Sequence, residues 1–190
     1  GLPLWLPKGA YLRDKLIDFM KQTQLKFGYS PVATPHIGAK ELYVCSGHYD
    51  KYGEDSFQPI KTPHENEEFF LKPMNCPHHC EIYRSKPHSY KELPIRLAEF
   101  GTVYRYELSG AVHGLLRSRG FTQDDSHIFC TREQVPEELS SLLAFCLSVL
   151  RDFGFNDFQA KLSTRPPDKS VGDDELWDLA TEGLRQALEK

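Results

Sequence analysis

The chain has 190 residues, of which 39% are hydrophobic and 26% are charged, and its formal net charge is −4. This length supports one good hydrophobic core, and the composition is that of an ordinary soluble, globular protein. A negative net charge without a basic run argues against a protein that binds nucleic acid over its whole surface, so any contact with RNA must be local.

The cysteines and the apolar runs indicate a reducing compartment. The chain contains five cysteines, and an odd number argues against a disulfide framework and for thiols that are free or metal-bound. No apolar run is long enough to cross a membrane, and the first residues lack the pattern of a signal peptide. We therefore expect a cytoplasmic protein without a membrane partner.

The first forty residues predict a long helix followed by a strand. Residues 9–27 form the predicted helix, and Gly28 follows as its stop. Its apolar stripe consists of Leu12, Leu16, Phe19 and Met20. Residues 29–37 are a predicted strand, which Pro31 and Pro35 restrict to an edge or an interface.

Residues 73–83 (PMNCPHHCEIY) predict a second helix with a thiol at its start. Pro77 suits the first helical turn, which places Cys76 near the N-terminus of the helix, where a thiolate is favoured. The spacing also permits a local zinc cluster of Cys76, His79 and Cys80.

The remaining elements are predicted from periodicity and turn residues. The expected elements are a short helix within 41–52, a loop over 53–68, a strand from 69, helices over 136–153 and 173–190, and a strand over 155–163 between them. Thr131, Gln134 and Pro136 together form a typical helix start before the first of the two long helices.

Residues 98–130 predict a hairpin of two strands around a polar loop. Arg105 and Glu107 lie two apart, and in a strand this spacing puts both side chains on one face. The second strand has four side chains at period two, namely Phe121, Gln123, Asp125 and His127. A face with this composition is too polar for a hydrophobic core.

The residue types of this hairpin suit a nucleoside triphosphate. Arg105 and Arg117 can grip phosphate oxygens through planar guanidinium forks. Glu107 can accept from an exocyclic amine, and a purine can stack on Phe121. The chain has no Gly-rich phosphate loop of the G-x-x-x-x-G-K-[ST] type. The alternative is a surface hairpin with solvated charges.

Two sequence motifs resemble those of a known family. The runs F-G-x-x-x-R-x-E over 100–107 and R-x-R-G-F-x-Q-D-D-x-H-I-F over 117–129 resemble motif 2 of class II aminoacyl-tRNA synthetases, and the Q-D-D ending resembles the threonyl-tRNA synthetase family in particular. Residues 72–79 (KPMNCPHH) are similar to the cysteine-bearing stretch of that family. The resemblance extends over most of the chain.

The resemblance implies a fold and a domain organisation. The expected fold class is α+β, an antiparallel sheet flanked by helices in a partial class II catalytic core. Residues 1–190 would form one fragment of that domain, with motif 1 at about 9–37 and motif 2 at about 98–130. Motif 1 implies a homodimer in the full enzyme. Nothing in the chain matches motif 3, so a truncated catalytic core is expected.

The implied activity is that of a threonine–tRNA ligase, which activates L-threonine with ATP and transfers it to tRNA(Thr). The implied catalytic residues are Arg105 and His48. The implied ATP-binding residues are Arg105, Glu107, Arg117, Phe121 and Gln123. The implied threonine-binding residues are Met74, Asp125, Gln123 and Tyr52. Mg²⁺ is expected with the ATP.

The resemblance also implies one zinc ion, held by Cys76 and His127 and by a third protein ligand outside this chain. A zinc with an open position can coordinate the amine and the hydroxyl of threonine, and valine lacks the second of these groups. Two alternatives to the ligase remain: a non-catalytic paralogue that keeps the fold, and a zinc-stabilised RNA-binding module.

Overall fold

The computed structural model describes residues 1–49, 56–166, 170 and 172–189. They form two compact units. The first comprises Gly1–His88 and Arg96–His127, and the second comprises Ser89–Ile95 and Ile128–Lys190. In the part of the chain that is described, no helix combines the length and the apolar character needed to cross a membrane.

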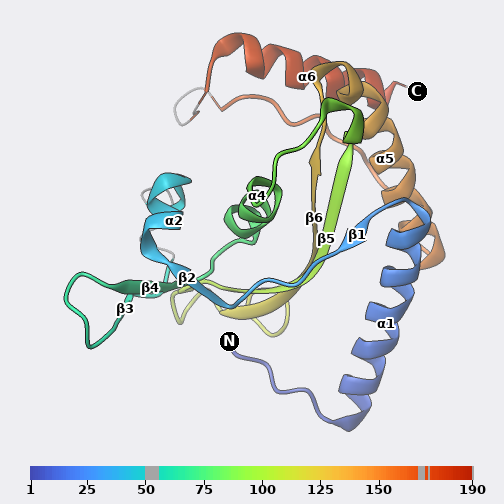
Figure 1. Cartoon of the computed structure of the whole chain (residues 1–190). Coiled ribbons are helices and arrows are strands. Elements are labelled where there is room, and N and C mark those ends of the chain that lie inside the picture. Colours follow the sequence, from blue (N-terminus) through green and yellow to red (C-terminus); the bar gives the residue numbers. More distant parts are fainter. Residues whose placement is uncertain (50–55, 167–169, 171, 190) are drawn as a thin grey trace. The chain divides into compact units, whose positions relative to one another are not determined.

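The first unit begins with helix α1 (Pro7–Lys26), which confirms the predicted helix within two residues at its start (Figure 1). Gly28 ends it with a φ of 79°, a left-handed conformation that favours glycine. The predicted apolar stripe is largely exposed, with Leu12 at 60% and Leu16 at 42%. The helix instead buries Thr23 and Gln24 near its C-terminal end.

The strand predicted over 29–37 is divided between two sheets. Strand β1 (Ser30–Pro31) pairs in parallel with β5 (Ile95–Tyr104), whose other neighbour is β6 (Gly120–Phe129). Strand β2 (Ile37–Ala39) belongs to the second sheet. The prediction of one continuous strand is wrong because Pro31 and Pro35 have no N–H groups to continue a ladder.

The second sheet is antiparallel, with β4 (Glu68–Leu71) between β2 and β3 (Ile60–Lys61). Strand β3 lies inside the stretch that was predicted to be a loop. Helix α2 (Lys40–Cys45) follows β2, and the ring of Tyr43 lies 5.4 Å from that of Phe70, between centroids. Both rings are buried and form an aromatic centre for this sheet.

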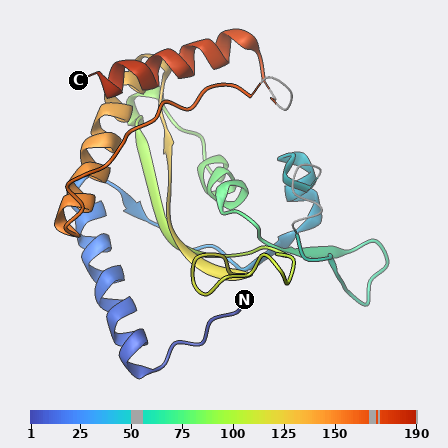
Figure 2. The ribbon, with the colours of Figure 1, turned by 180° about the vertical axis from the view of Figure 1, so that it is seen from behind.

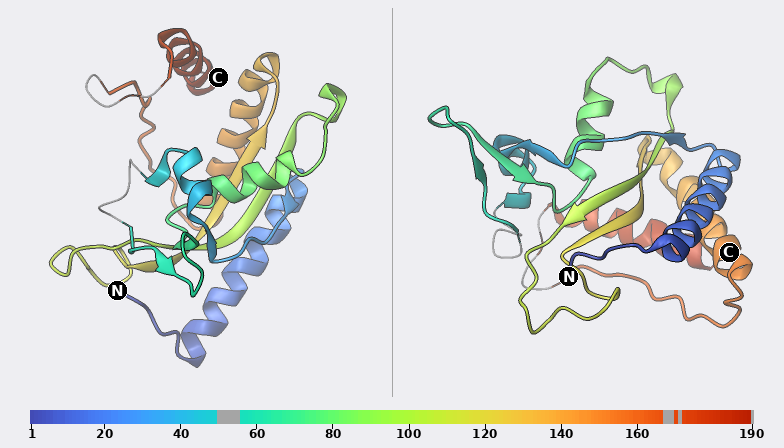
Figure 3. Two further views of the ribbon diagram at one scale, coloured as in Figure 1. Left: turned by 60° about the vertical axis from the view of Figure 1, so that its left-hand side comes forward. Right: turned by 90° about the horizontal axis from the view of Figure 1, so that it is seen from below.

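Strands β5 and β6 carry helices on opposite faces, α1 on one and α4 (Cys76–Arg84) on the other (Figures 1 and 2). The alternation of β6 explains this arrangement. Arg13 of α1 donates to Thr122 Oγ1 at 3.3 Å, and Gln24 of α1 donates to Asp124. Asp125 and His127, at alternate positions, instead contact Asn75 at the start of α4 and His79 within it, so these two share a face, as the period-two pattern predicted. The loop of residues 105–119 extends beyond the ends of the two strands (Figure 3).

The second unit contains helix α5 (Val135–Asp152) and helix α6 (Asp174–Leu188), which pack on each other at the buried Gly183. The predicted helix start is confirmed, since the Thr131 N–H donates to Gln134 Oε1 at 2.9 Å. The strand predicted over 155–163 is wrong, because these residues form no strand and Phe155 and Phe158 are exposed. Alternating apolar residues become a strand only where a neighbouring strand satisfies their backbone.

Candidate active site

A buried network of polar side chains lies between α4 and the β5–β6 strands. Its centre is Glu99 of β5, which accepts from the Thr34 N–H at 2.7 Å and from His79 Nε2 at 2.9 Å. Lys72 donates to Thr34 Oγ1 at 2.8 Å, and its Nζ lies 3.6 Å from Glu99 Oε1. Lys72, His79 and Glu99 are all buried. These charges are therefore compensated inside the protein rather than by solvent.

The network keeps Glu99 ionised despite its burial. Burial acts to raise the pKa of the Glu99 carboxyl, but the hydrogen bonds from His79 and Thr34 and the charge of Lys72 outweigh it and hold the pKa below its ordinary value. Burial lowers the pKa of Lys72, and the Glu99 charge opposes this shift. The result is a buried acid and base that stabilise each other's charged forms.

His79 connects this network to β6. Its Nδ1 lies 2.8 Å from Nδ1 of His127, and the two ring centroids are 4.6 Å apart at an interplanar angle of 76°. His79 thus contacts Glu99 with one ring nitrogen and His127 with the other. One turn of α4 separates His79 from Cys76, so the contact also brings the N-terminus of α4 to β6.

Asn75, Cys76 and Asp125 meet at the same place. Asn75 Nδ2 donates to Asp125 Oδ2 at 2.9 Å. Burial and then the negative charge of Asp125 raise the pKa of the Cys76 thiol. Burial lowers the pKa of His127, and Asp125 opposes that shift. Asp125 therefore influences the pKa of both the Cys76 thiol and the His127 imidazole.

The backbone of β5 at Gly101 lies very close to the side chain of Asn75. The side chain is fully buried, and a Cβ added at Gly101 would lie 2.4 Å from Asn75 Oδ1. Only glycine leaves room at this position of β5. Within the described residues, Asn75 Oδ1 has no hydrogen-bond partner. The amide is thus positioned by its bond to Asp125 and by the shape of the cavity around it.

Arg105 and Phe121 lie together at the other end of β6. The guanidinium carbon of Arg105 lies 5.3 Å from the centroid of the Phe121 ring, and its Nε donates to the Pro73 carbonyl at 3.4 Å. Strand β5 ends at Tyr104, so Arg105 and Glu107 do not lie in a strand and the face predicted for them does not form. The Arg105 N–H still donates to Arg119 O at 2.9 Å.

Glu107 and Arg117 pair with each other in the loop between β5 and β6. The Nε of Arg117 lies 3.0 Å from Glu107 Oε2, and the Arg117 side chain is 61% exposed. Arg119 Nε donates to the Glu107 carbonyl at 2.9 Å and fixes the same turn. The two residues predicted to contact opposite ends of ATP are therefore ion-paired in this structure.

The other predicted site residues are distributed as follows. Met74 and Gln123 are half-buried, the first between Pro73 and Asn75 and the second on β6 between Phe121 and Asp125. His48 follows α2, where its Nδ1 lies 2.9 Å from Ser46 Oγ. Tyr52 lies outside the described residues.

The local zinc cluster left open by the spacing is not formed. Cys80 is exposed, whereas His79 is buried and contacts Glu99 and His127. Across the described ranges, no group of three or more His, Cys, Asp or Glu side chains is placed to hold a metal ion. Of the two predicted zinc ligands, Cys76 lies one turn of α4 from His79, and His127 contacts His79.

Sequence reasoning missed Thr34, Lys72, Asn75 and Glu99. Two of them carried a signal, since Glu99 is a charged residue inside an apolar strand and Lys72 directly follows the apolar end of β4. Charged residues are almost never fully buried unless they are paired. A charge inside one apolar strand and another directly after a second apolar strand therefore indicate an ion pair.

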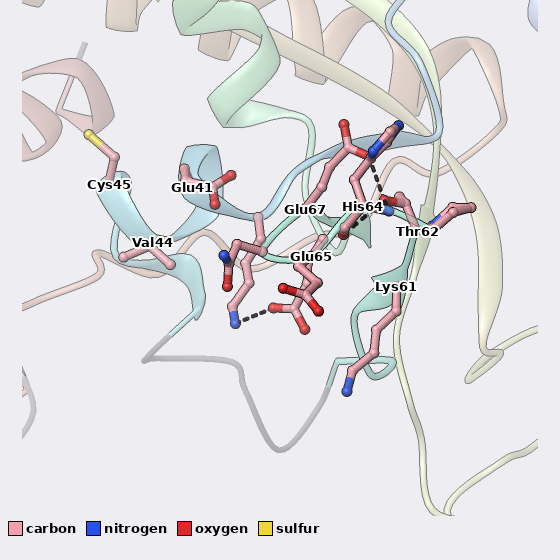
Figure 4. Close-up of a pocket in the computed structure, with 12 residues that line it drawn as sticks. Glu41, Val44, Cys45, Lys61, Thr62, His64, Glu65 and Glu67 are labelled. Carbon is pink, nitrogen blue, oxygen red and sulfur yellow. Dashed lines mark hydrogen bonds and ion pairs between the residues drawn. The ribbon is translucent and has the colours of Figure 1, made fainter.

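A large cavity of the first unit lies elsewhere, between α2 and the β3–β4 hairpin (Figure 4). It has a volume of about 820 Å³, and its walls include Lys40, Glu41, Lys61, His64, Glu65 and Glu68. The ion pair between Lys40 and Glu68, with 2.6 Å between Nζ and Oε2, neutralises part of this charge. None of the predicted site residues that the structure describes lines the cavity.

Comparisons with known proteins show the family of the chain. The family model of the tRNA synthetase class II core domain (G, H, P, S and T) matches residues 58–189. Threonine–tRNA ligases from Cytophaga hutchinsonii and Porphyromonas gingivalis are 63% and 56% identical over 98% and 100% of this chain. The chain spans 30% of the length of each of these relatives.

Solved structures give the same result. The RNA binding domain of threonyl-tRNA synthetase from Cryptosporidium parvum Iowa II matches with a TM-score of 0.85 and 40% identity, over 98% of this chain and 45% of that one. The prolyl-tRNA synthetase of Giardia lamblia, at 19% identity and a TM-score of 0.68 over 77% of this chain and 30% of that one, shares the fold. The predicted α+β fold of helices around small antiparallel sheets is thus confirmed, and the chain belongs to the class II tRNA synthetase core-domain family, with threonine–tRNA ligases among its relatives.

Proposed function

We propose that this chain is part of the catalytic core of a threonine–tRNA ligase, which joins L-threonine to tRNA(Thr) with ATP. The observation that carries the proposal is the arrangement along β6. Phe121 lies beside Arg105 and would serve as a nucleotide platform, and further along the strand Asp125 and His127 contact Asn75 and His79, where the amino-acid site is proposed. Identities of 61–63% to three threonine–tRNA ligases over 98% of the chain support the choice of amino acid.

The reaction has two steps. The threonine carboxylate attacks the α-phosphorus of ATP to form threonyl-adenylate and release pyrophosphate. A ribose hydroxyl of the terminal adenosine of tRNA then takes the threonyl group and releases AMP. Arg105 offsets the negative charge that grows on the α-phosphate, and its contact with Phe121 holds the guanidinium in place before the reaction. The Phe121 ring stacks on the adenine.

ATP binding requires a change of partners at the β5–β6 loop. In the proposed complex, Arg117 holds the γ-phosphate and Glu107 accepts from the adenine amine, so the 3.0 Å ion pair between them opens. The Arg117 side chain is 61% exposed and that of Glu107 is 16% exposed, so solvent reaches the pair from the arginine side and opening it costs about 1 kcal/mol. Mg²⁺ accompanies the triphosphate. His48 is proposed as a further catalytic residue, and Gln123 orients the substrates.

The threonine site is proposed around Asp125. Cys76 Sγ and His127 Nε2 would hold a zinc ion, because a thiolate and an imidazole are donors that zinc prefers and His79 engages only the Nδ1 of His127. The third ligand, a histidine, lies outside this chain. Zinc would supply an open position for the amine and the hydroxyl of threonine. Asp125 accepts from that hydroxyl, and Met74 and Tyr52 complete the pocket.

Two further proposals concern assembly and location. The exposed apolar residues of α1, which include Leu12 and Leu16, form a surface suited to the homodimer contact expected of motif 1. A cytoplasmic location follows from the requirement for tRNA and ATP in the same compartment.

Calorimetry with a non-hydrolysable threonyl-adenylate analogue tests the proposed function. The chain should bind the threonyl analogue more tightly in the presence of Zn²⁺, and the isosteric valyl analogue should gain little from the metal. Equal binding of both analogues with and without zinc would contradict the proposed amino-acid site. Binding of RNA with indifference to ATP and to both analogues would favour a non-catalytic paralogue instead.

A further inference from the structure

We propose that His79 is a positioning residue, which fixes His127 in the one neutral tautomer that can bind a metal ion. It belongs to a chain of hydrogen bonds that begins at Lys72 and Thr34, passes through Glu99 and His79, and ends at His127. We call this chain of hydrogen bonds the relay. The inference rests on the proposed metal role of His127. The relay itself is built from hydrogen bonds within the chain.

The direction of the relay is set at its buried end. Lys72 Nζ can only donate, so Thr34 Oγ1 accepts from it at 2.8 Å and turns its own proton toward Glu99 Oε2 at 2.9 Å. The Thr34 N–H donates to the other carboxylate oxygen at 2.7 Å. Glu99 therefore acts as an acceptor throughout, and His79 Nε2, 2.9 Å from Oε2, must carry a proton.

The next step fixes the proton between the two histidines. The contact between His79 Nδ1 and His127 Nδ1, at 2.8 Å, requires one donor and one acceptor. A neutral His79 that is protonated at Nε2 presents a lone pair at Nδ1. His127 must then donate through Nδ1–H, and in the neutral ring its Nε2 carries the free lone pair that a metal ion requires.

The alternative is a cationic His79, with protons on both nitrogens. His127 would then accept through Nδ1 and carry its own proton on Nε2, which blocks the metal-binding atom. Glu99 already has a buried cation beside it, since Lys72 Nζ lies 3.6 Å from its Oε1, so the carboxylate does not require a second charge from His79.

This arrangement extends a general rule for metal-binding histidines. Such a histidine donates its second N–H to a carboxylate, a carbonyl or a water, which sets its tautomer and ring orientation. Here the acceptor is a second histidine, supported by a carboxylate one step further inside. The near-perpendicular rings, at 76°, also restrict rotation of His127.

Long-range ¹H–¹⁵N NMR of the histidine rings in the metal-free chain tests the relay directly. We expect the wild-type protein to show His127 protonated at Nδ1 and His79 protonated at Nε2. Neutral His127 protonated at Nε2, or a cationic His79, would overturn the proposal. This measurement needs no variant, so it decides the matter even if substitutions at His79 prevent folding.

Three substitutions separate positioning from packing. In His79→Asn the amide oxygen can occupy the place of Nδ1 and still accept from His127. His79→Gln reaches toward Glu99 but offers His127 no acceptor, and His79→Leu offers neither. We expect the Nδ1–H tautomer of His127 to persist in the asparagine variant and to be lost in the other two. An unchanged tautomer in His79→Leu would overturn the relay.

A Zn²⁺ titration followed on the His127 ring signals separates the relay from the proposed metal site. Zinc affinity should fall about 10- to 100-fold in His79→Leu and His79→Gln and change only a few-fold in His79→Asn. Equal losses in all three would indicate packing alone and contradict the positioning role. The predicted tautomers without any zinc binding by the wild-type chain would uphold the relay and refute the proposed zinc site.

Discussion

Glu107 and Arg117 form an ion pair across the loop between β5 and β6, with 3.0 Å between Oε2 and Nε. Both residues are proposed to bind ATP, one at the adenine and the other at the γ-phosphate. On that proposal, the pair separates before the nucleotide is held. Because the Arg117 side chain is 61% exposed, it is available to a ligand at small cost, whereas Glu107 is only 16% exposed.

The first prediction concerns this pair. Arg117→Ala should weaken ATP binding about 10-fold, because one charge-assisted contact to the γ-phosphate is lost. AMP binding should stay the same, since AMP lacks that phosphate. Calorimetric titrations with both nucleotides measure the difference. Arg84→Ala, which removes an exposed arginine paired with Glu81, is the control. Equal losses for ATP and AMP would show that Arg117 does not contact the γ-phosphate.

The second prediction concerns the buried pair of Lys72 and Glu99. Lys72→Met should destabilise the chain by about 3–5 kcal/mol, because it leaves the Glu99 charge without its buried partner. Urea unfolding measures this loss. Lys40→Met, in the solvent-screened pair with Glu68, is the control and should have a much smaller effect.

A double variant checks the cause of that loss. Lys72→Met combined with Glu99→Gln removes both charges, so its destabilisation should be smaller than the sum of the two single effects. Additive losses would mean that the two residues do not stabilise each other.

The third prediction concerns acid stability. The folded-state pKa of Glu99 lies below its ordinary value of 4.5, so its contribution to stability is fully present above pH 4.5. It is lost as the pH falls through the folded-state pKa. Urea midpoints measured from pH 7 downward should fall less steeply in Glu99→Gln than in the wild-type chain. Parallel curves for the two proteins would argue against an ionised Glu99.

The fourth prediction concerns the close approach at Gly101. Gly101→Ala places a Cβ 2.4 Å from Asn75 Oδ1, inside the contact distance of the two atoms. We expect a loss of about 1–3 kcal/mol in unfolding free energy, and weaker binding of the threonyl-adenylate analogue, since Asn75 holds Asp125.

Gly110→Ala is the matched control for that change. A Cβ at Gly110 meets no atom within 4 Å, so this variant should keep both stability and binding close to the wild-type values. Similar effects of the two substitutions would show that the contact with Asn75 is unimportant.

The sequence predicted one part of the site well, because that part depends on local periodicity. The alternation along β6 correctly separated the residues that face α4, such as Asp125 and His127, from Thr122 and Asp124, which contact α1. A strand with one helix on each face preserves this pattern in the sequence.

The parts that sequence reasoning missed depend on partners far away in the chain. Glu99 is stabilised by Thr34 and His79, which lie 65 and 20 residues away, and nothing near it in the sequence reveals them. The same reason explains the strand wrongly predicted over 155–163. Apolar and polar residues do alternate there, but a strand also needs a neighbouring strand that pairs with its backbone N–H and C=O groups.

The central claim is that Cys76 and His127 bind the same zinc ion. X-ray absorption at the zinc edge of the zinc-loaded chain tests it directly, with Cys76→Ala compared against Cys80→Ala, which alters an exposed thiol. We predict one sulfur and one imidazole ligand in the wild-type chain, loss of the sulfur in Cys76→Ala, and no change in Cys80→Ala. A sulfur signal that survives in Cys76→Ala and disappears in Cys80→Ala would contradict the account.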